Sequence, residues 1–342
     1  MSRRHRIILV FTLLSAFASY QNYDLSIPAH FPPLHYNLKK NPLSEETVQL
    51  GRLLFYDPIL SADSSISCAS CHSSYNGFAH TDHKLSHGIH DLVGTRNAPA
   101  LCNLGWQPLF MWDGAHRHLD MQALAPISHP REMGFSIAGV VQRLEENTHY
   151  RQHFYRAFAD SNVSGERVLK ALAQFQLTLI SADSKYDKML RGQARFSEQE
   201  ARGYQLFRKH CNACHAEPLF SNYQLNANGL PPDALLNDTG RMGITGKAAD
   251  RYRFKTPSLR NLSYTFPYMH DGRFQTLSAV MQHYSEGVSA TSSPGTALPG
   301  PLKLSSTEKV DLVSFLLTLN DSAFVFNRKH AYPMELRTYW KK

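Results

Sequence analysis

Two copies of one five-residue pattern constrain this chain more than any other feature. The pattern is Cys-x-x-Cys-His, formed by Cys68, Cys71 and His72 and again by Cys211, Cys214 and His215. Two thiols at this spacing can form thioethers with the vinyl groups of one porphyrin, and the adjoining histidine then ligates the iron. The alternatives are chance recurrence and a zinc site. A zinc ribbon spaces its cysteine pairs roughly 15–20 residues apart, whereas these motifs start 143 residues apart (211 − 68). The sequence therefore predicts two covalently bound haems c.

The first residues have the pattern of an export signal. Three arginines precede an apolar stretch at 7–14, and a small-x-small cleavage site follows at 16–18. The apolar stretch is shorter than the ~18–20 residues of a spanning helix, which favours cleavage over an uncleaved anchor. We therefore expect a signal peptide over residues 1–18 and a periplasmic product without a membrane span. Export agrees with haem c, which is attached outside the bacterial cytoplasm.

Length and charge bound the remaining options. A chain of 342 residues suits two domains, which we place at 19–190 and 191–342 with one haem in each. The net charge of +8 falls to about +5 without the three signal-peptide arginines (8 − 3), and no dense basic run indicates nucleic acid. A mildly positive surface would suit an acidic electron donor, or is simply solvated. The fifth cysteine, Cys102, lies in an apolar setting typical of a buried small hydrophobe.

A second internal repeat supports two related domains. Ser44 and Ser197 each precede a helical pattern, and Ser197 forms a capping box with Glu200. Within these helices the pattern Gly-x-x-Leu-Phe occurs at 51–55 and again at 203–207, and each copy leads into a haem motif.

Other periodic stretches indicate further helices. They cover about 137–158, 166–180 and 277–287. A last helix, capped at Ser305, is expected to bury Val310, Val313, Phe315, Leu316 and Leu317. Strand signals are weak. The predicted fold class is mainly α: two cytochrome c-like haem domains with long loops and little β.

The segment 110–134, between the two motifs, carries a third pattern. It contains a Trp-Asp-Gly run, then Gln-Ala, a proline and Glu-Met. Trp112 precedes Gln122 by ten residues, and Gln122 precedes Pro126 by four and Glu132 by ten. In these residues the chain resembles the bacterial di-haem cytochrome c peroxidases and their relative MauG. The resemblance extends to 96–99, 259–261 and 267–272, and so covers most of the chain.

The resemblance implies roles for these four residues. Cleavage of a peroxide O–O bond requires one oxygen to lose a proton and the other to gain one, and a carboxylate beside the open haem face can carry it. Glu132 is the candidate, with Gln122 orienting peroxide, Pro126 shaping the pocket wall and Trp112 relaying electrons between the haems. Outside this context Glu132 would be an ordinary surface charge and Trp112 a core residue.

A calcium site is also implied by the resemblance. Asn97 corresponds to the family's calcium ligand, and the backbone carbonyls of Thr265 and Pro267 would complete an all-oxygen site of the kind that calcium accepts. These ligands come from both predicted domains, so a bound ion would fix the geometry between the haems.

The sequence leaves the sixth ligand of each haem unassigned. The family's first haem has a displaceable distal histidine, and the loop after the first motif offers His80, His83, His87 and His90. His87-Gly88 matches best, although its distance to Arg96 is off by two. If no histidine ligates, this haem is permanently open and needs no reductive activation.

The second haem raises a different question. Fourteen residues after His270, where many of these peroxidases carry a ligating methionine, this chain has Tyr284, and MauG also uses tyrosine there. Met281 is a rival ligand, Met269 is a weaker one, and Tyr284 as a core aromatic is the alternative. A phenolate lowers the potential of the iron, whereas a thioether raises it.

The resemblance thus implies an enzyme that reduces hydrogen peroxide to water at the first haem. Electrons would enter at the second haem from a small cytochrome c or a cupredoxin. A MauG-type oxidase that uses peroxide to modify a partner protein, and a di-haem electron carrier, are the alternatives. A homodimer is possible.

Overall fold

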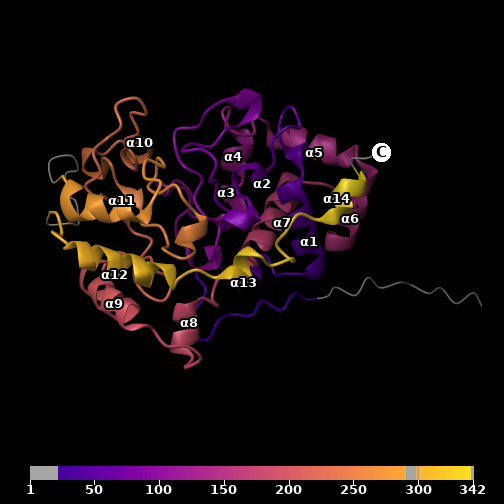
Figure 1. Cartoon of the computed structure of the whole chain (residues 1–342). Coiled ribbons are helices and arrows are strands. Elements are labelled where there is room, and N and C mark those ends of the chain that lie inside the picture. Colours follow the sequence, from indigo (N-terminus) through magenta and orange to yellow (C-terminus); the bar gives the residue numbers. More distant parts are fainter. Residues whose placement is uncertain (1–21, 290–297, 299, 340–342) are drawn as a thin grey trace, which may run out of the picture.

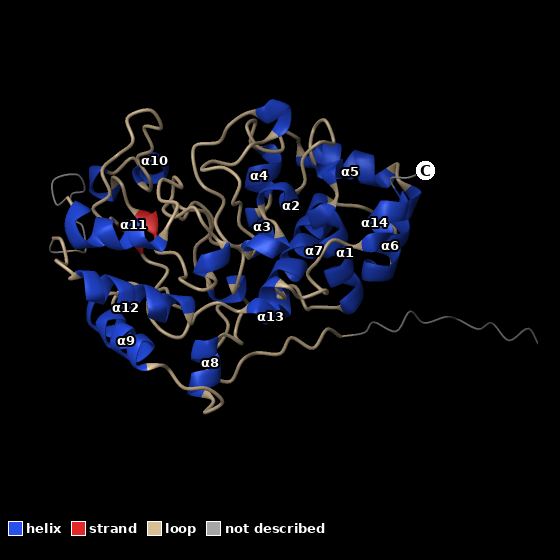
Figure 2. Ribbon diagram, in the orientation of Figure 1, coloured by secondary structure: helices blue, strands red, loops and turns tan. Residues whose placement is uncertain are grey.

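The computed structural model describes residues 22–289, 298 and 300–339, so the predicted signal peptide lies outside the described residues. The described chain is mainly helical, as predicted (Figure 2). Its one described sheet pairs two short antiparallel strands, β1 (Leu225–Asn226) and β2 (Phe254–Lys255). None of the helices described has the length and apolar character needed to cross a membrane.

A first core cluster is built mainly from the N-terminal half of the chain (Figure 1). The helices of that half are α1 (Glu45–Tyr56), α2 (Cys68–Cys71), α3 (Leu119–Gln122), α4 (Leu124–Ser128), α5 (Ile137–Glu145), α6 (Thr148–Phe158) and α7 (Gly165–Leu177). Four 3₁₀ turns near the haem motif and the Trp-Asp-Gly run join them: η2 (Pro58–Leu60), η3 (Ser74–Asn76), η4 (Ile89–Asp91) and η5 (Leu104–Trp106).

A second core cluster gathers residues of the C-terminal half. Its helices are α8 (Lys185–Leu190), α9 (Glu198–His210), α10 (Met242–Thr245), α11 (Leu277–Gln282), a π-helical turn η8 (His283–Gly287) and α12 (Ser306–Leu317). The chain then returns to the first cluster through α13 (Ser322–Val325) and α14 (Met334–Tyr339) (Figure 1). Phe324, Val325 and Leu336 are buried there. Tyr186 of α8 packs in the second cluster although it precedes residue 191, and α13 and α14 follow the second cluster but pack in the first. The boundary at 190/191 stays a prediction.

Each cluster is organised by one close helix crossing at the glycine of the predicted repeat. A Cβ on Gly51 of α1 would lie 1.9 Å from the backbone oxygen of Ala171 in α7, and a Cβ on Gly203 of α9 would lie 1.9 Å from that of Asp311 in α12. No side chain fits at such a separation. Only glycine allows the two backbones of each pair to approach this closely.

An aromatic trio fills the space beside each crossing. Phe55 packs edge-on against Phe175 with ring centroids 5.2 Å apart, and Phe207 lies 5.0 Å from Phe315. A third ring completes each set, Phe78 in the first and Phe220 in the second. All six phenylalanines are at most 1% exposed. The repeat seen in the sequence is therefore a repeat of packing.

The predicted helix starts are confirmed, with two corrections. The Ser44 side chain accepts from the Thr47 amide, and Ser197 forms its capping box with Glu200. The predicted helix over 137–158 is wrong, because it is two helices: the Asn147 side chain accepts amide hydrogen bonds at the start of α6 and so begins a new helix.

The buried face of α12 also differs from the prediction. Val310 is 57% exposed and Leu317 is 44% exposed, while Leu312, Phe315 and Leu316 are buried. The crossing at Gly203 turns the Asp311 side of α12 toward α9, and Arg202 pairs with Asp311 at 2.9 Å. The helix partner therefore sets which face is buried.

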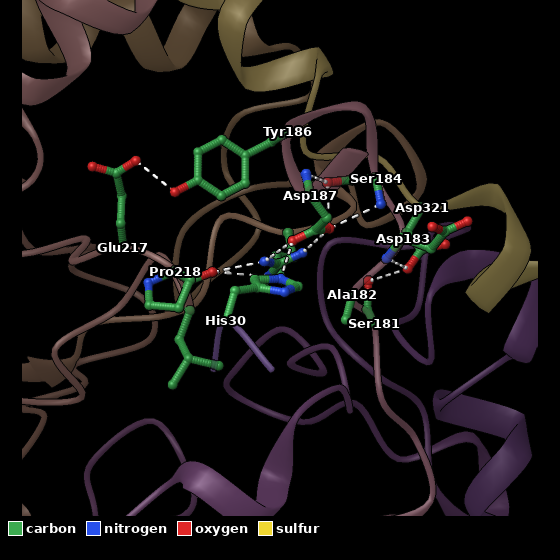
Figure 3. Close-up of polar contacts among 12 residues, drawn as sticks. His30, Ser181, Ala182, Asp183, Ser184, Tyr186, Asp187, Glu217, Pro218 and Asp321 are labelled. Atoms are coloured by element: carbon green, nitrogen blue, oxygen red, sulfur yellow. Dashed lines mark hydrogen bonds and ion pairs between the residues drawn. The ribbon is translucent and has the colours of Figure 1, made fainter. Parts of the chain in front are cut away.

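A buried ion pair joins α8 to the C-terminal half (Figure 3). Asp187 and Arg260 have fully buried side chains and share two hydrogen bonds of 2.8 Å. Arg260 also donates to the Pro218 carbonyl, and His30 Nε2 lies 2.8 Å from Asp187. Burial raises the pKa of Asp187, but Arg260 outweighs it and holds that pKa at about 2. The carboxylate is therefore charged and paired at neutral pH.

Gly51→Ala and Gly203→Ala should each lower the free energy of unfolding by about 1–3 kcal/mol, because the new methyl group forces the crossing helices apart. Gly243→Ala in α10 is the control, since the nearest atom to its Cβ would be Thr239 Oγ1 at 3.5 Å. Urea unfolding of the three variants measures the difference. Equal stability of all three would contradict this account of the crossings.

Candidate functional site

The first motif forms α2, which packs against α1, and ends in a fixed histidine. His72 Nδ1 lies 2.8 Å from the backbone oxygen of Phe78. A carbonyl oxygen can only accept a hydrogen bond, so Nδ1 carries the proton and Nε2 keeps its lone pair. This arrangement orients an iron-ligating histidine and selects its tautomer.

The second motif repeats this arrangement. His215 Nδ1 lies 3.2 Å from the backbone oxygen of Phe220 and 3.1 Å from that of Pro257. Phe78 and Phe220 both have a positive φ, 61° and 55°. In each half the residue that inserts its ring beside the helix crossing also turns its carbonyl to the histidine.

The residues present fit two haems c. All five cysteines are described and unpaired, so the four motif thiols are free for thioether formation. Burial lowers the pKa of His72 and of His215 to about 4, which keeps both imidazoles in the neutral, ligating form. Beside the second motif lies a cavity of about 240 Å³. Its lining contains leucines of α11 and α12 and no aspartate or glutamate.

All three candidate sixth ligands of the second haem line this cavity, together with Cys211, Cys214 and His215. Tyr284 lies in the π-helical turn η8, and burial raises its pKa to about 12, with smaller contributions from the nearby motif thiols. Met281 is buried in the second core cluster. Met269 Sδ accepts a hydrogen bond of 3.5 Å from Asn228 Nδ2. Tyr284 therefore shares a cavity with both motif cysteines.

Two loop segments converge on Cys71 of the first motif. Cys71 Sγ lies 3.7 Å from the backbone oxygen of His87, and the Ile89 amide donates to the backbone oxygen of Glu132 at 2.8 Å. A Cβ on Gly88 would lie 2.1 Å from the Arg131 oxygen. The predicted distal-histidine loop and the predicted Glu132 loop therefore lie against each other, beside the first motif.

The His87 imidazole itself is held by a carboxylate. Its Nδ1 lies 2.5 Å from Asp91 Oδ1, and its ring centroid is 4.6 Å from that of His83. His83 in turn stacks on His80 at 5.5 Å. Three of the four histidines considered from the sequence thus form a row on this loop.

Glu132 is partly exposed, with 37% of its side chain accessible, and lies 3.7 Å from His129 Nδ1. Burial raises the pKa of Glu132, while His129 opposes this effect. The carboxylate is close enough to Cys71 that its charge, after burial, raises the pKa of that thiol. A carboxyl group with a raised pKa beside the first motif is suited to take up and release a proton.

Gln122 and Pro126 lie in the two short helices before Glu132. Gln122 Nε2 donates to Met111 Sδ at 3.4 Å, and the Pro126 carbonyl accepts from the Met133 amide at 3.1 Å. Pro126 thus holds the residue after Glu132, and Gln122 contacts the residue before Trp112.

Trp112 is held between the two halves of the chain. Its Nε1–H donates to the Asn97 carbonyl at 2.8 Å, and its own carbonyl accepts from the Lys255 amide at 2.6 Å. Trp112 also lines the cavity beside the second haem motif. Asn97, Thr265 and Pro267, the predicted calcium ligands, line the same cavity. The Asn97 amide nitrogen donates to the Lys84 carbonyl, which leaves its oxygen as the available ligand atom.

Sequence reasoning missed a longer internal repeat that the structure makes visible. Residues 110–114 and 268–272 read Phe-Met-Trp-Asp-Gly and Tyr-Met-His-Asp-Gly, an offset of 158 (268 − 110). Met111 and Met269 share a positive φ, and each segment closes a β-bridge, Phe110 with His116 and Tyr268 with Phe274. The similar residues at 110–114 and 268–272 were the sequence signal that could have revealed this repeat.

This repeat pairs Pro126 with Tyr284, at the same offset (284 − 126). Helix α3 begins at Leu119 and α11 at Leu277, again 158 apart, so the two segments are equivalent helices. Where the second half places a phenol, the first half places a proline, which has no atom able to ligate iron.

Two other sets of residues were missed. Arg96 pairs with Asp113, next to Trp112, and with Asp238 from the C-terminal half, both at 2.6 Å. Lys255 is buried and donates to Gln107 at 2.9 Å. Neither Lys255 nor Gln107 belongs to a sequence motif by which it could have been identified.

The chain matches the di-haem cytochrome c peroxidase family over residues 45–195. The methylamine utilization protein MauG of Methylorubrum extorquens is 39% identical over 293 residues, covering 82% of this chain and 80% of that protein. The cytochrome c551 peroxidase of Nitrosomonas europaea is 35% identical over 246 residues, 70% of this chain and 73% of that protein.

A solved structure extends the match. A MauG-like protein associated with microbial copper homeostasis is 32% identical, with a TM-score of 0.82, and the match covers 91% of this chain and 99% of that one. Two haem-binding motifs on one helical scaffold define a di-haem cytochrome, and the peroxidase relatives support oxidoreductase activity. The chain belongs to the di-haem cytochrome c peroxidase family, which includes MauG, as the sequence predicted.

Proposed function

We propose that this protein is a periplasmic di-haem peroxidase that reduces hydrogen peroxide to two waters, taking up two electrons and two protons. A small cytochrome c or a cupredoxin would deliver the electrons at the second haem. The observation that carries this proposal is that the segments of His87 and Glu132 lie against each other where His87 contacts Cys71 of the first motif. This arrangement supports a role for the Glu132 carboxyl group in carrying a proton between the peroxide oxygens.

The residues around the first motif divide the work of handling peroxide. A haem held by Cys68, Cys71 and His72 supplies the iron and the redox chemistry of O–O cleavage. Glu132 takes the proton from one peroxide oxygen and returns it to the other, and its raised pKa suits both steps. Gln122 would orient peroxide, and Pro126, whose side chain has no ligating atom, would leave the iron free to bind it.

In this proposal the second site would take in the electrons. Cys211, Cys214 and His215 hold its haem, and Tyr284 would close the sixth position, since its phenol is buried near both thiols. Trp112, fixed at both its indole nitrogen and its carbonyl, would relay electrons toward the first site. A calcium ion bound by Asn97, Thr265 and Pro267 would stabilise this region between the halves.

A second candidate function rests on Tyr284. A phenolate ligand stabilises ferric iron, which suits an oxidase more than a haem that accepts electrons readily. The relative named MauG and the MauG-like structure support this alternative, in which peroxide would oxidise a partner protein. Peroxide consumption with a reduced small cytochrome favours the first function. Consumption that depends on an added protein favours the second.

Glu132→Gln should slow peroxide turnover by about 10²–10⁴ because the amide cannot carry the proton. Steady-state peroxide consumption by the two-haem protein measures this. Glu145→Gln, on the exposed end of α5, is the matched control and should leave the rate unchanged. A Glu132→Gln rate equal to that of the control would refute the proton-carrying role.

Tyr284→Met should raise the midpoint potential of the second haem and change its absorption spectrum, because a thioether replaces a phenolate. Met281→Leu should alter neither. A redox titration followed by absorbance compares the two variants with the wild type. The reverse pattern would assign the ligand to Met281, and no change in either variant would exclude both residues.

A further inference from the structure

Lys255 is a buried lysine in an unusual setting. It is only 9% exposed, lies in β2 and lines the cavity of the second haem motif. Its Nζ donates to Gln107 Oε1 at 2.9 Å and lies 5.7 Å from the centre of the Tyr223 ring. Both contacts are with neutral groups. A buried ammonium group is costly unless an anion pairs with it.

Within the described part of the chain, this ammonium group has no carboxylate partner. No aspartate or glutamate lines the cavity, and no ion pair of Lys255 occurs among the described residues. No aspartate or glutamate occurs in the sequence of the segments that the structure does not describe, which are residues 1–21, 290–297, 299 and 340–342. The other cationic side chain of the lining, Arg260, is already paired with Asp187. A bound anionic group is therefore the partner that we consider for Lys255.

The cavity lining combines apolar and polar side chains, and a haem has both an apolar and a polar edge. Leu277, Leu312 and Leu316 from α11 and α12 form an apolar wall. Amide side chains from the other half of the chain, Asn97 and Gln107, line it as well, and Gln107 is the residue that Lys255 contacts. Haem c has an apolar edge, where the thioethers form, and an opposite edge that carries two anionic propionates.

We propose that Lys255, supported by Gln107, is the cationic partner of a propionate of the second haem. The pair would satisfy the buried ammonium group and neutralise one carboxylate. Burial lowers the pKa of Lys255 to about 8, and a propionate beside it opposes that shift.

This contact also ties the second haem to the segment between the haems. The backbone amide of Lys255 donates a hydrogen bond to the Trp112 carbonyl, and Gln107 directly follows η5 in the N-terminal half. The side chain is thus a positioning residue: it acts on the potential of the second haem and on its seating against the N-terminal half, without touching peroxide. The inference rests on the second haem and not on the peroxidase reaction.

Lys255→Met in the two-haem protein tests the pairing by two readouts. Loss of the positive charge leaves the propionate uncompensated, which stabilises the ferric haem. We expect its reduction equilibrium to shift by about tenfold, a fall of about 59 mV in midpoint potential. The resonance Raman propionate-bending band of the second haem should shift as well, because that band reports on hydrogen bonding to the carboxylate.

Lys247→Met is the control, because it removes an exposed lysine from the same half of the chain and should change neither readout. An unchanged potential, or a fall in potential with an unmoved propionate band, overturns the pairing. Haem content is measured first. If the methionine variant does not retain two haems, Lys255→Gln, which removes the charge and keeps a polar group, is judged by the same criteria. Peroxide turnover plays no part, so failure of the peroxidase proposal leaves this test intact.

Discussion

A hydrogen bond from a histidine to a phenylalanine carbonyl underlies the whole arrangement, and it is made twice. Its acceptors, Phe78 and Phe220, are held because their rings lie in the space beside a helix crossing that only glycine permits. The positive φ of each phenylalanine then turns its carbonyl toward the imidazole. Helix packing therefore selects the tautomer and the orientation of each predicted iron ligand. A loss of either crossing would release the histidine along with the core.

The two halves share this frame and differ in what faces the iron. The repeat with an offset of 158 places Pro126 where the second half has Tyr284. A proline cannot ligate, so the first site is left to the loops that converge on Cys71. The second site is enclosed by Tyr284, by leucines and by a lysine without a carboxylate partner. Under the proposed function, one duplicated scaffold would provide an open site for an oxidant and a closed site for electrons.

Much of this could be read from the sequence. The haem motifs, the glycine helices and their serine caps are local patterns, and local patterns predict well. The face of α12 could not be read, because its crossing with α9 decides that Val310 is exposed and Leu312 buried. Asn147 interrupts a pattern that is apolar on both sides, and the return of α13 and α14 to the first cluster depends on contacts distant in sequence.

The same distinction between local patterns and distant contacts applies to the candidate site. Trp112, Gln122 and Glu132 were found because they belong to one spaced run, while Lys255 lies in no motif and is identified only by its burial. The central claim, one open and one closed haem, is tested most directly by counting ligand-accessible irons during stepwise reduction. The account predicts that added cyanide or carbon monoxide binds one haem of the two, with one high-spin signal. Binding at both irons, or at neither in any redox state, would contradict it.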